Sequence, residues 1–130
     1  MTTPPGFATV TPYIFVQEAD AFMRFLVDGL GGEVVGISYR PDGAIANGQV
    51  RIGSATVMVS EASDAFPAMP ASYYLYVHNA DSAMTRAIAA GATSIMDVAD
   101  MPYQDRQGGV RDPHGNIWWI SQRLVEGGYD

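Results

Sequence analysis

The side chains that could bind a metal or move protons are two histidines and fourteen carboxylates in a chain of 130 residues. His78 follows a strand-like run, and His114 stands in an Asp-Pro-His-Gly turn, so the pair shows no metal-ligand spacing. Entry to a helix and exposure on a turn explain the two histidines without catalysis. The absence of cysteine and lysine excludes thiolate metal sites, cysteine nucleophiles and Schiff-base chemistry.

Two carboxylates stand next to arginines, Asp105 beside Arg106 and Asp112 beside Arg111. We interpret both as local ion pairs rather than as an acid and base that share a substrate. The glycine-rich run 29–32 follows a predicted helix instead of preceding one, so it does not predict a phosphate-binding loop. These patterns favour binding over catalysis.

Aromatic residues recur in two similar stretches. The sequence from Thr11 to Met23 returns at Ser72 to Met84 with five of thirteen positions identical. Each stretch opens with alternating strand-type residues and then changes to helical spacing. Alternation places an aliphatic set under the helix, namely Ile14, Val16, Leu75 and Val77. The opposite face then carries a polar and aromatic set: Thr11, Tyr13, Phe15, Ser72, Tyr74 and Tyr76.

The elements that must position this aromatic face follow the order β-α-β-β-β, twice. The predicted strands cover 11–16, 33–40, 44–52, 55–60, 72–77, 93–98, 106–111 and 116–122. Apolar stripes predict the helices, through Phe22, Phe25, Leu26 and Leu30 in the first and Met84, Ala87 and Ile88 in the second. Asn79 is a predicted N-cap, and Gly31 and Gly91 are predicted left-handed C-terminal caps.

Length and composition predict a single domain of 1–130, because 130 residues with 48% hydrophobic content suffice for one core but not for two. Module one spans 7–60, the connector 61–71 and module two 72–124. Residues 1–6 and 126–130 are expected to be loose ends.

The closing segment from Pro102 to Gln122, PYQDRQGGVRDPHGNIWWISQ, resembles the vicinal oxygen chelate superfamily, in its glyoxalase/bleomycin-resistance (PhnB-like) branch. The similarity covers roughly residues 10–124. It implies an α+β fold in which two βαβββ modules form a curved sheet around a cleft. It also implies that such proteins often form homodimers, sometimes exchanging modules.

Enzymes of that superfamily hold a divalent metal with one side chain from the first and last strand of each module. The matching positions here are Thr11, Met58, Ser72 and Trp119. None of them is a carboxylate or an imidazole, and neighbouring positions are no better. The resemblance therefore predicts no metal site, no cofactor and no catalytic residue.

The function predicted from these features is a metal-free small-molecule binding protein that sequesters a cationic or planar aromatic compound, as in antibiotic resistance. Its predicted ligand-binding residues are Tyr13, Phe15, Met58, Tyr74, Tyr76, Tyr103, Arg106 and Trp119. One alternative is a metal-dependent lyase, isomerase or dioxygenase with relocated ligands drawn from Glu18, Glu61, His78 and His114. Another is a ligand-free dimeric interaction module in which the rings fill the core.

The net charge of the chain bears on which partners it can bind. A net charge of −7 with no basic stripe argues against nucleic acid. No apolar run is long enough to span a bilayer, and the start MTTPPGF does not resemble a signal peptide. We therefore expect a cytoplasmic protein that binds no membrane, has a small-molecule ligand and forms a homodimer.

Overall fold

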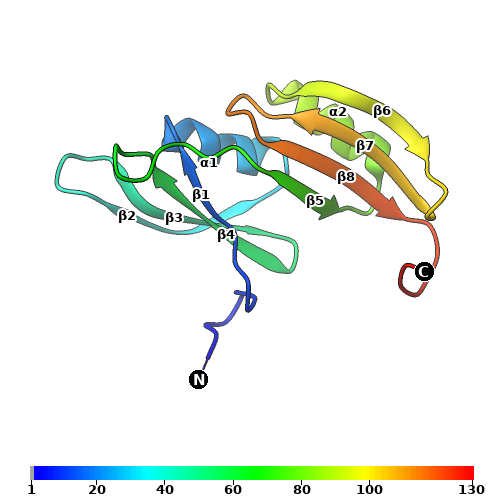
Figure 1. The fold of residues 1–130 in the computed structure, drawn as a ribbon, viewed down its shortest axis with the longest axis horizontal. Helices are drawn as coiled ribbons and strands as arrows, with labels where there is room; N and C mark the ends of the chain where they lie inside the picture. The colour runs from blue at the N-terminus through cyan, green and yellow to red at the C-terminus, as the bar shows by residue number, and fades with distance from the viewer. Residues whose placement is uncertain (1) are drawn as a thin grey trace. The chain divides into compact units, whose positions relative to one another are not determined.

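The computed structural model describes residues 2–130, which form two compact units divided between Pro70 and Ala71 (Figure 1). Met1, in the first predicted loose end, lies outside the described residues. Each unit contains four strands and one helix, so the predicted α+β class with two βαβββ modules is confirmed. No helix within residues 2–130 combines the length and the hydropathy needed to cross a membrane.

Module one contains the strand β1 (Tyr13–Val16), the helix α1 (Ala19–Asp28) and three further strands. These strands are β2 (Glu33–Tyr39), β3 (Ile45–Ile52) and β4 (Ala55–Glu61). The sheet order is β1-β4-β3-β2, with β1 parallel to β4 and the other pairs antiparallel.

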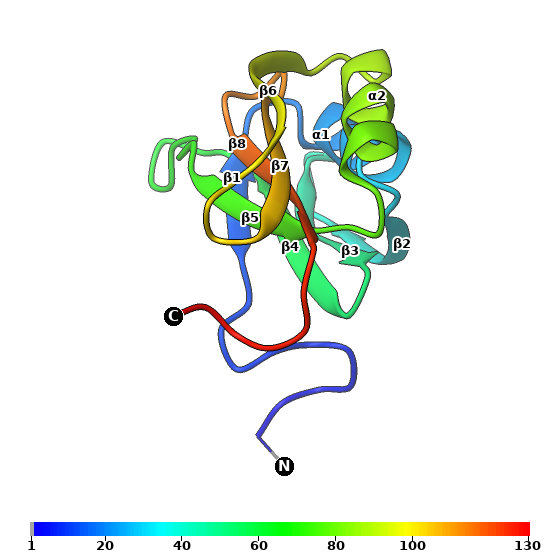
Figure 2. The same ribbon diagram turned by 90° about the vertical axis from the view of Figure 1, so that its right-hand side faces the viewer.

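Module two repeats this arrangement with β5 (Ser72–Tyr76), α2 (Ala80–Ala89), β6 (Thr93–Asp100), β7 (Asp105–Arg111) and β8 (Ile117–Arg123). Its sheet order is β5-β8-β7-β6, with β5 parallel to β8. In Figure 2, α2 covers one face of this sheet and leaves the other face without a helix. Every strand begins and ends within two residues of its predicted bounds.

The core of each module lies between its helix and its sheet. Phe22 and Leu26 of α1 are fully buried, whereas Leu30 lies beyond the helix and is only half-buried. In α2 the prediction for Ile88 is wrong, because this side chain is 44% exposed while Met84 and Ala87 are buried. The apolar stripe of α2 is therefore narrower than the sequence indicates.

The repeat reproduces packing contacts as well as element order. Met23 of α1 lies against Gly48 of β3, and Met84 of α2 lies against Gly108 of β7. A Cβ atom at Gly108 would lie only 2.8 Å from the Met84 sulfur, so a larger residue there would displace the methionine side chain. The identical methionines of the two repeats thus perform the same packing role.

The first turns of α1 and α2 are stabilised in the same way. The Glu61 carboxylate accepts hydrogen bonds from the backbone N–H groups of Glu18 and Ala19, at 3.1 and 2.9 Å. In module two the side-chain carbonyl of Gln122 accepts from the N–H of Ala80 at 3.0 Å. The last strand of each module therefore satisfies a free N–H at the first turn of its helix. Asn79 is confirmed as an N-cap, since its side chain accepts from the N–H of Ser82.

Candidate functional site

The face of the module-two sheet that turns away from α2 carries the exposed aromatic side chains. In the parallel pairing of β5 with β8, Tyr74 is opposite Trp119 and Tyr76 is opposite Ser121, which places all four on one face. Tyr74 and Tyr76 are 43% and 57% exposed, and their ring centroids lie 5.2 Å apart. Two rings are therefore accessible side by side.

Trp119 lies on the same face. Its indole ring is fixed by one hydrogen bond and by packing on the sheet. Its indole N–H donates to the hydroxyl of Ser72 at 3.0 Å. Its six-membered ring covers Gly109 on β7, where a Cβ atom would lie 2.8 Å from the nearest ring carbon. The missing side chain at Gly109 lets the indole lie flat on the sheet.

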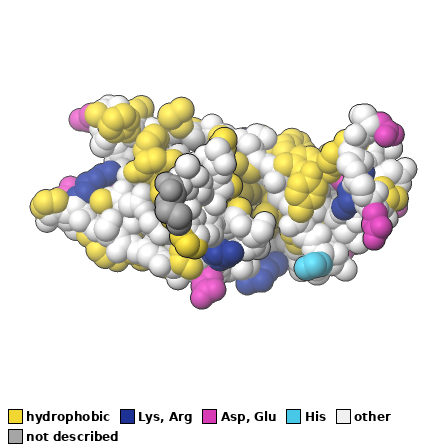
Figure 3. Space-filling view, turned by 90° about the horizontal axis from the view of Figure 1, so that it is seen from below, with side chains coloured by type: hydrophobic (Ala, Val, Ile, Leu, Met, Phe, Trp, Pro, Cys, Tyr) yellow, Lys and Arg dark blue, Asp and Glu magenta, His cyan; other side chains and the backbone are white. Residues whose placement is uncertain are grey.

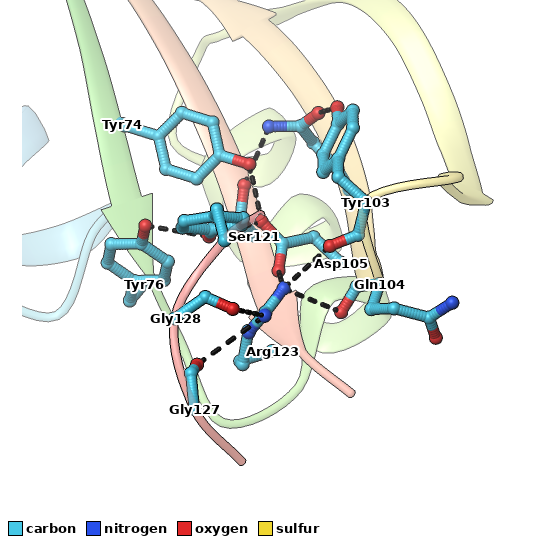
Figure 4. Close-up of polar contacts among 11 residues, drawn as sticks. Tyr74, Tyr76, Tyr103, Gln104, Asp105, Ser121, Arg123, Gly127 and Gly128 are labelled. Carbon is cyan, nitrogen blue, oxygen red and sulfur yellow. Dashed lines mark hydrogen bonds and ion pairs between the residues drawn. The ribbon is translucent and has the colours of Figure 1, made fainter. Parts of the chain in front are cut away.

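A buried carboxylate lies beside these rings. Asp105, at the start of β7, is fully buried and accepts hydrogen bonds from Tyr74 at 2.5 Å, Tyr129 at 2.6 Å and Arg123 at 3.1 Å (Figure 4). Burial would raise the pKa of Asp105. The hydrogen bonds from Tyr129, Tyr74 and Arg123 outweigh burial and hold that pKa below its usual value. Asp105 is therefore an ionised carboxylate at neutral pH.

A second polar chain joins the loop before β7 to this face. The hydroxyl of Tyr103 donates to the side-chain carbonyl of Gln107, and the Gln107 amide donates to the hydroxyl of Ser121 at 2.8 Å. Gln107 and Ser121 are both buried, while Tyr103 is 42% exposed. The loop tyrosine is thereby fixed at the edge of the face that carries Tyr74.

Arg123, the last residue of β8, connects this cluster to the segment that follows. One terminal nitrogen donates to Asp105 and to the carbonyl of Tyr103 at 2.6 Å, and the other donates to the carbonyl of Gly128 at 2.7 Å (Figure 4). Its guanidinium carbon lies 4.2 Å from the centroid of the Tyr129 ring. One cation thus holds strand, loop and following segment together.

The prediction that Asp105 pairs with Arg106 is wrong. Alternation along β7 places Arg106 on the helix side of the sheet, where it donates to Asp81 at 2.9 and 3.1 Å and to Asp100 at 2.9 Å. The pKa of Asp81 is lowered by these hydrogen bonds from Arg106. Arg106, which was predicted to bind ligand, therefore lies on the opposite face from Tyr74, Tyr76 and Trp119.

The predicted pair of Asp112 with Arg111 does not form either. Asp112 is buried and accepts from the backbone N–H of His114 at 2.8 Å and of Asn116 at 3.1 Å. Its second oxygen accepts from the indole N–H of Trp118 at 2.8 Å. Asp112 therefore stabilises the turn before β8, in line with the structural interpretation of that turn.

Module one carries a smaller aromatic group. Tyr13 is opposite Met58 in the β1–β4 pairing, so both lie on one face, with Phe15 next to them at 4.9 Å between ring centroids. Phe66, in the segment after β4, stacks on Phe15 at 5.7 Å. Phe66 was not predicted, because nothing in the connector's sequence indicates that it folds back on β1.

A hollow of about 710 Å³ lies elsewhere in module one, on the helix side of the sheet. It is lined by apolar and charged side chains of α1, β2, β3 and β4, including Met23, Val27, Val34, Ile37, Asp20 and Glu61. Sequence reasoning did not predict it. The predicted residues Tyr13, Phe15 and Met58 do not line this hollow.

Comparison with known proteins identifies the family. The model of the Glyoxalase/Bleomycin resistance protein/Dioxygenase superfamily matches residues 6–120. The chain belongs to this superfamily. A relative from Mycobacterium bovis, itself uncharacterised, is 29% identical over 131 residues, covering 90% of this chain and 84% of that protein.

Two solved structures of the superfamily fold are similar to this chain. TioX from Micromonospora sp. ML1 has a TM-score of 0.70 at 23% identity and covers 89% of this chain and 99% of its own. TnmS3 from Streptomyces sp. CB03234, described as an antibiotic binding protein, has a TM-score of 0.69 at 16% identity, with coverages of 89% and 97%. At these identities the likeness concerns the fold.

The usual metal positions of the superfamily hold residues that do not fit a divalent cation. The hydroxyl of Thr11 donates to the carbonyl of Ala8 at 2.9 Å, and the hydroxyl of Ser72 accepts from Trp119. Met58 and Trp119 supply no hard oxygen or imidazole donor. Throughout residues 2–130, no three histidine or carboxylate side chains gather into a group that could hold a metal ion. Glu61 in particular is engaged at the start of α1.

The structure thus brings four predicted residues together in module two, Tyr74, Tyr76, Tyr103 and Trp119, and three in module one. Sequence reasoning missed Asp105, Arg123 and Tyr129. Alternation along β7 and β8 contained part of the signal, because residues 105, 107 and 109 and residues 119, 121 and 123 share one face. Tyr129 lay in a predicted loose end and gave no such signal.

Proposed function

We propose that this protein is a metal-free binding protein for a small planar aromatic or cationic compound, which it sequesters without chemical change. The observation that carries the proposal is the exposed aromatic face of Tyr74, Tyr76 and Trp119 beside the buried, ionised carboxylate of Asp105. Aromatic rings bind flat ligands by stacking, and a carboxylate fixes a hydrogen-bond donor. Fold similarity to an antibiotic binding protein supports a function of this kind.

The free energies of these contacts can be compared with the free energy that micromolar binding requires. Stacking contributes about 0.5–1.5 kcal/mol per ring beyond apolar burial, and a desolvated cation on a ring contributes up to ~2 kcal/mol. Micromolar affinity requires about 8 kcal/mol. Three rings supply at most about 4.5 kcal/mol, so apolar burial and polar contacts of the ligand must supply the rest. Module one adds a second surface, formed by Tyr13, Phe15 and Met58.

The charge distribution fits a small organic ligand better than a nucleic acid. On the face shown in Figure 3, the arginines among the described residues are separated by uncharged atoms and do not form a continuous basic surface, whereas hydrophobic side chains gather in patches. Such patches are typical of ligand or protein contact. A homodimer and a cytoplasmic location stay predictions.

The proposal is tested by measuring thermal stabilisation of the protein across a panel of planar aromatic and cationic compounds. Trp119→Ala should lose the response, and Tyr39→Ala, which removes an exposed ring from β2 in module one, should keep it. No response of the wild-type protein to any compound would remove the main support. Elemental analysis of protein purified without chelators tests the metal-dependent alternative, since a stoichiometric divalent metal would contradict the proposal.

A further inference from the structure

The segment that follows β8 returns to the aromatic face of module two and places one ring on it. The hydroxyl of Tyr129 donates to the Asp105 carboxylate at 2.6 Å and lies 2.8 Å from the hydroxyl of Tyr76. The ring of the same residue lies over the guanidinium of Arg123. A free phenol could make all of these contacts, because none of them involves the backbone of Tyr129.

The N–H of Leu124 donates to the carbonyl of Gln104 at 2.9 Å, and beyond this bond the segment is weakly attached. Leu124 and Val125 are 40% and 44% exposed, so neither belongs to the buried core. No atom lies within 4 Å of the position a side chain would take at Gly127 or Gly128. Only the carbonyls of these two glycines are held, both by Arg123. A segment with few buried apolar contacts opens locally at low free energy.

If Tyr129 moves away, the position that it vacates on Asp105 favours a ligand with a hydrogen-bond donor. Asp105 would keep its hydrogen bonds from Tyr74 and Arg123 but would lose the one from Tyr129, which frees one acceptor position for the donor of a ligand. A compound that supplies a hydroxyl would restore the bond, while an isostere without a donor would not, so the site discriminates strongly between the two. The positive charge of Arg123, already paired with Asp105, disfavours a second cation at this position. A neutral hydroxyl is therefore the better match.

The space that the segment now occupies would hold the body of such a compound. A hollow of about 530 Å³ adjoins these groups and is lined by the loop before β7, by Arg123 and by the segment from Val125 to Asp130. Its lining includes Tyr103, Gln104 and Tyr129. Opening of the segment would remove the part of this wall that the segment forms and would leave the space open toward the rings of Tyr74 and Tyr76, which share the bonding network of Asp105.

We propose that residues 124–130 form a displaceable strap, and that the ligand is a hydroxylated aromatic compound whose phenolic group replaces that of Tyr129 on Asp105. This inference rests on the proposed function and narrows its ligand class from planar or cationic aromatics to phenols. In the closed state, Tyr129 of the strap competes with the ligand for the Asp105 carboxylate. If it is closed nine-tenths of the time or more, the apparent dissociation constant of the ligand rises about tenfold or more.

The test uses two probes that differ in one donor, 2-naphthol and 2-methoxynaphthalene, titrated by NMR into the full chain and its Tyr129→Ala variant. We expect Tyr129→Ala to bind 2-naphthol at least about tenfold more tightly than the wild type, with no comparable gain for 2-methoxynaphthalene. Tyr129→Phe, which keeps the ring but not the donor, should show an intermediate gain. Adding Asp105→Asn to Tyr129→Ala should reduce the preference for 2-naphthol.

Unchanged 2-naphthol affinity in Tyr129→Ala, or an equal gain for both probes, would overturn the proposal. Amide spectra matching those of the wild type outside residues 124–130 serve as the folding control. A wild-type response to the compound panel, combined with unchanged 2-naphthol affinity in Tyr129→Ala, would overturn the strap and leave the proposed function standing. Absence of binding to the panel and to both probes, in every variant, would overturn both.

Discussion

The indole N–H of Trp119 donates a hydrogen bond to the hydroxyl of Ser72, from one parallel strand of module two to the next. The resemblance described above matches both positions to places where enzymes of the superfamily hold a metal. Here they bind each other, and the indole lies on the sheet as a flat surface instead of a coordinating group.

Trp118 and Trp119 are neighbours with opposite roles, which makes them a matched pair for mutation. Trp118 is 3% exposed and packs on Tyr73 at 4.7 Å, so Trp118→Ala should lower the free energy of unfolding by about 3–5 kcal/mol. Trp119→Ala should cost clearly less, because that side chain is only half-buried, and should weaken ligand binding. Urea denaturation and ligand titration of both variants measure this. Equal losses of stability would place Trp119 in the core.

Gly109→Ala tests how the indole is seated. The new methyl group would lie 2.8 Å from the ring of Trp119, so we expect a loss of about 1–3 kcal/mol in stability and a displaced indole. Combining it with Trp119→Ala should give less than the sum of the two losses, since the clash disappears with the ring. Additive losses in urea denaturation would contradict a direct contact.

Asp105→Asn should change how the free energy of unfolding depends on pH. The pKa of Asp105 is lowered in the folded protein, so its ionised form stabilises the fold at pH values above the unfolded pKa of about 3.9. This contribution is lost as the pH falls through the folded pKa. The difference in unfolding free energy between wild type and Asp105→Asn should therefore be largest above about pH 5 and shrink in acid. A difference that is constant with pH would refute this role.

Tyr73, Tyr74 and Tyr129 should each ionise at a higher pH than an ordinary tyrosine. Burial and the hydrogen bond to Asp105 raise the pKa of Tyr74, hydrogen bonds to Asp105 and Tyr76 raise that of Tyr129, and burial followed by the charge of Asp112 raises that of Tyr73. Their stabilising contributions are complete below about pH 10 and are lost as the pH rises through the folded pKa values.

Ultraviolet absorbance of tyrosinate during a pH titration measures these groups. In Asp105→Asn, Tyr74 and Tyr129 should ionise at lower pH than in the wild type, while the delay of Tyr73 should persist because it does not depend on Asp105. A titration curve unchanged by Asp105→Asn would show that the carboxylate does not hold these phenols.

The sequence predicted the fold because local signals and the repeat agree. Alternation in Tyr13–Val16 and Ser72–Tyr76, helical stripes and the cap at Asn79 are all properties of neighbouring residues. The same alternation placed Tyr74 and Trp119 on one face. The helical spacing did not predict that Ile88 would be exposed, because burial of a helix residue depends on how far the sheet extends beneath the helix.

The charged groups were predicted less well, because ion pairing depends on distances between residues far apart in the chain. Asp105 was assigned to its neighbour Arg106, but adjacent residues of a strand point to opposite faces, so Asp105 meets Arg123 and Arg106 meets Asp81. Tyr129 was assigned to a loose end because nothing around it has strand or helix periodicity.

Residue types and their spacing alone determined the two modules and the aromatic face, because these follow from periodicity and from the chemistry of each side chain. Only the tertiary structure decided that Asp105, Tyr74, Arg123 and Tyr129 form one network. These four come from three strands and the segment after the last one. Their contact depends on strand pairing and on the path of the chain after β8, which no local pattern specifies.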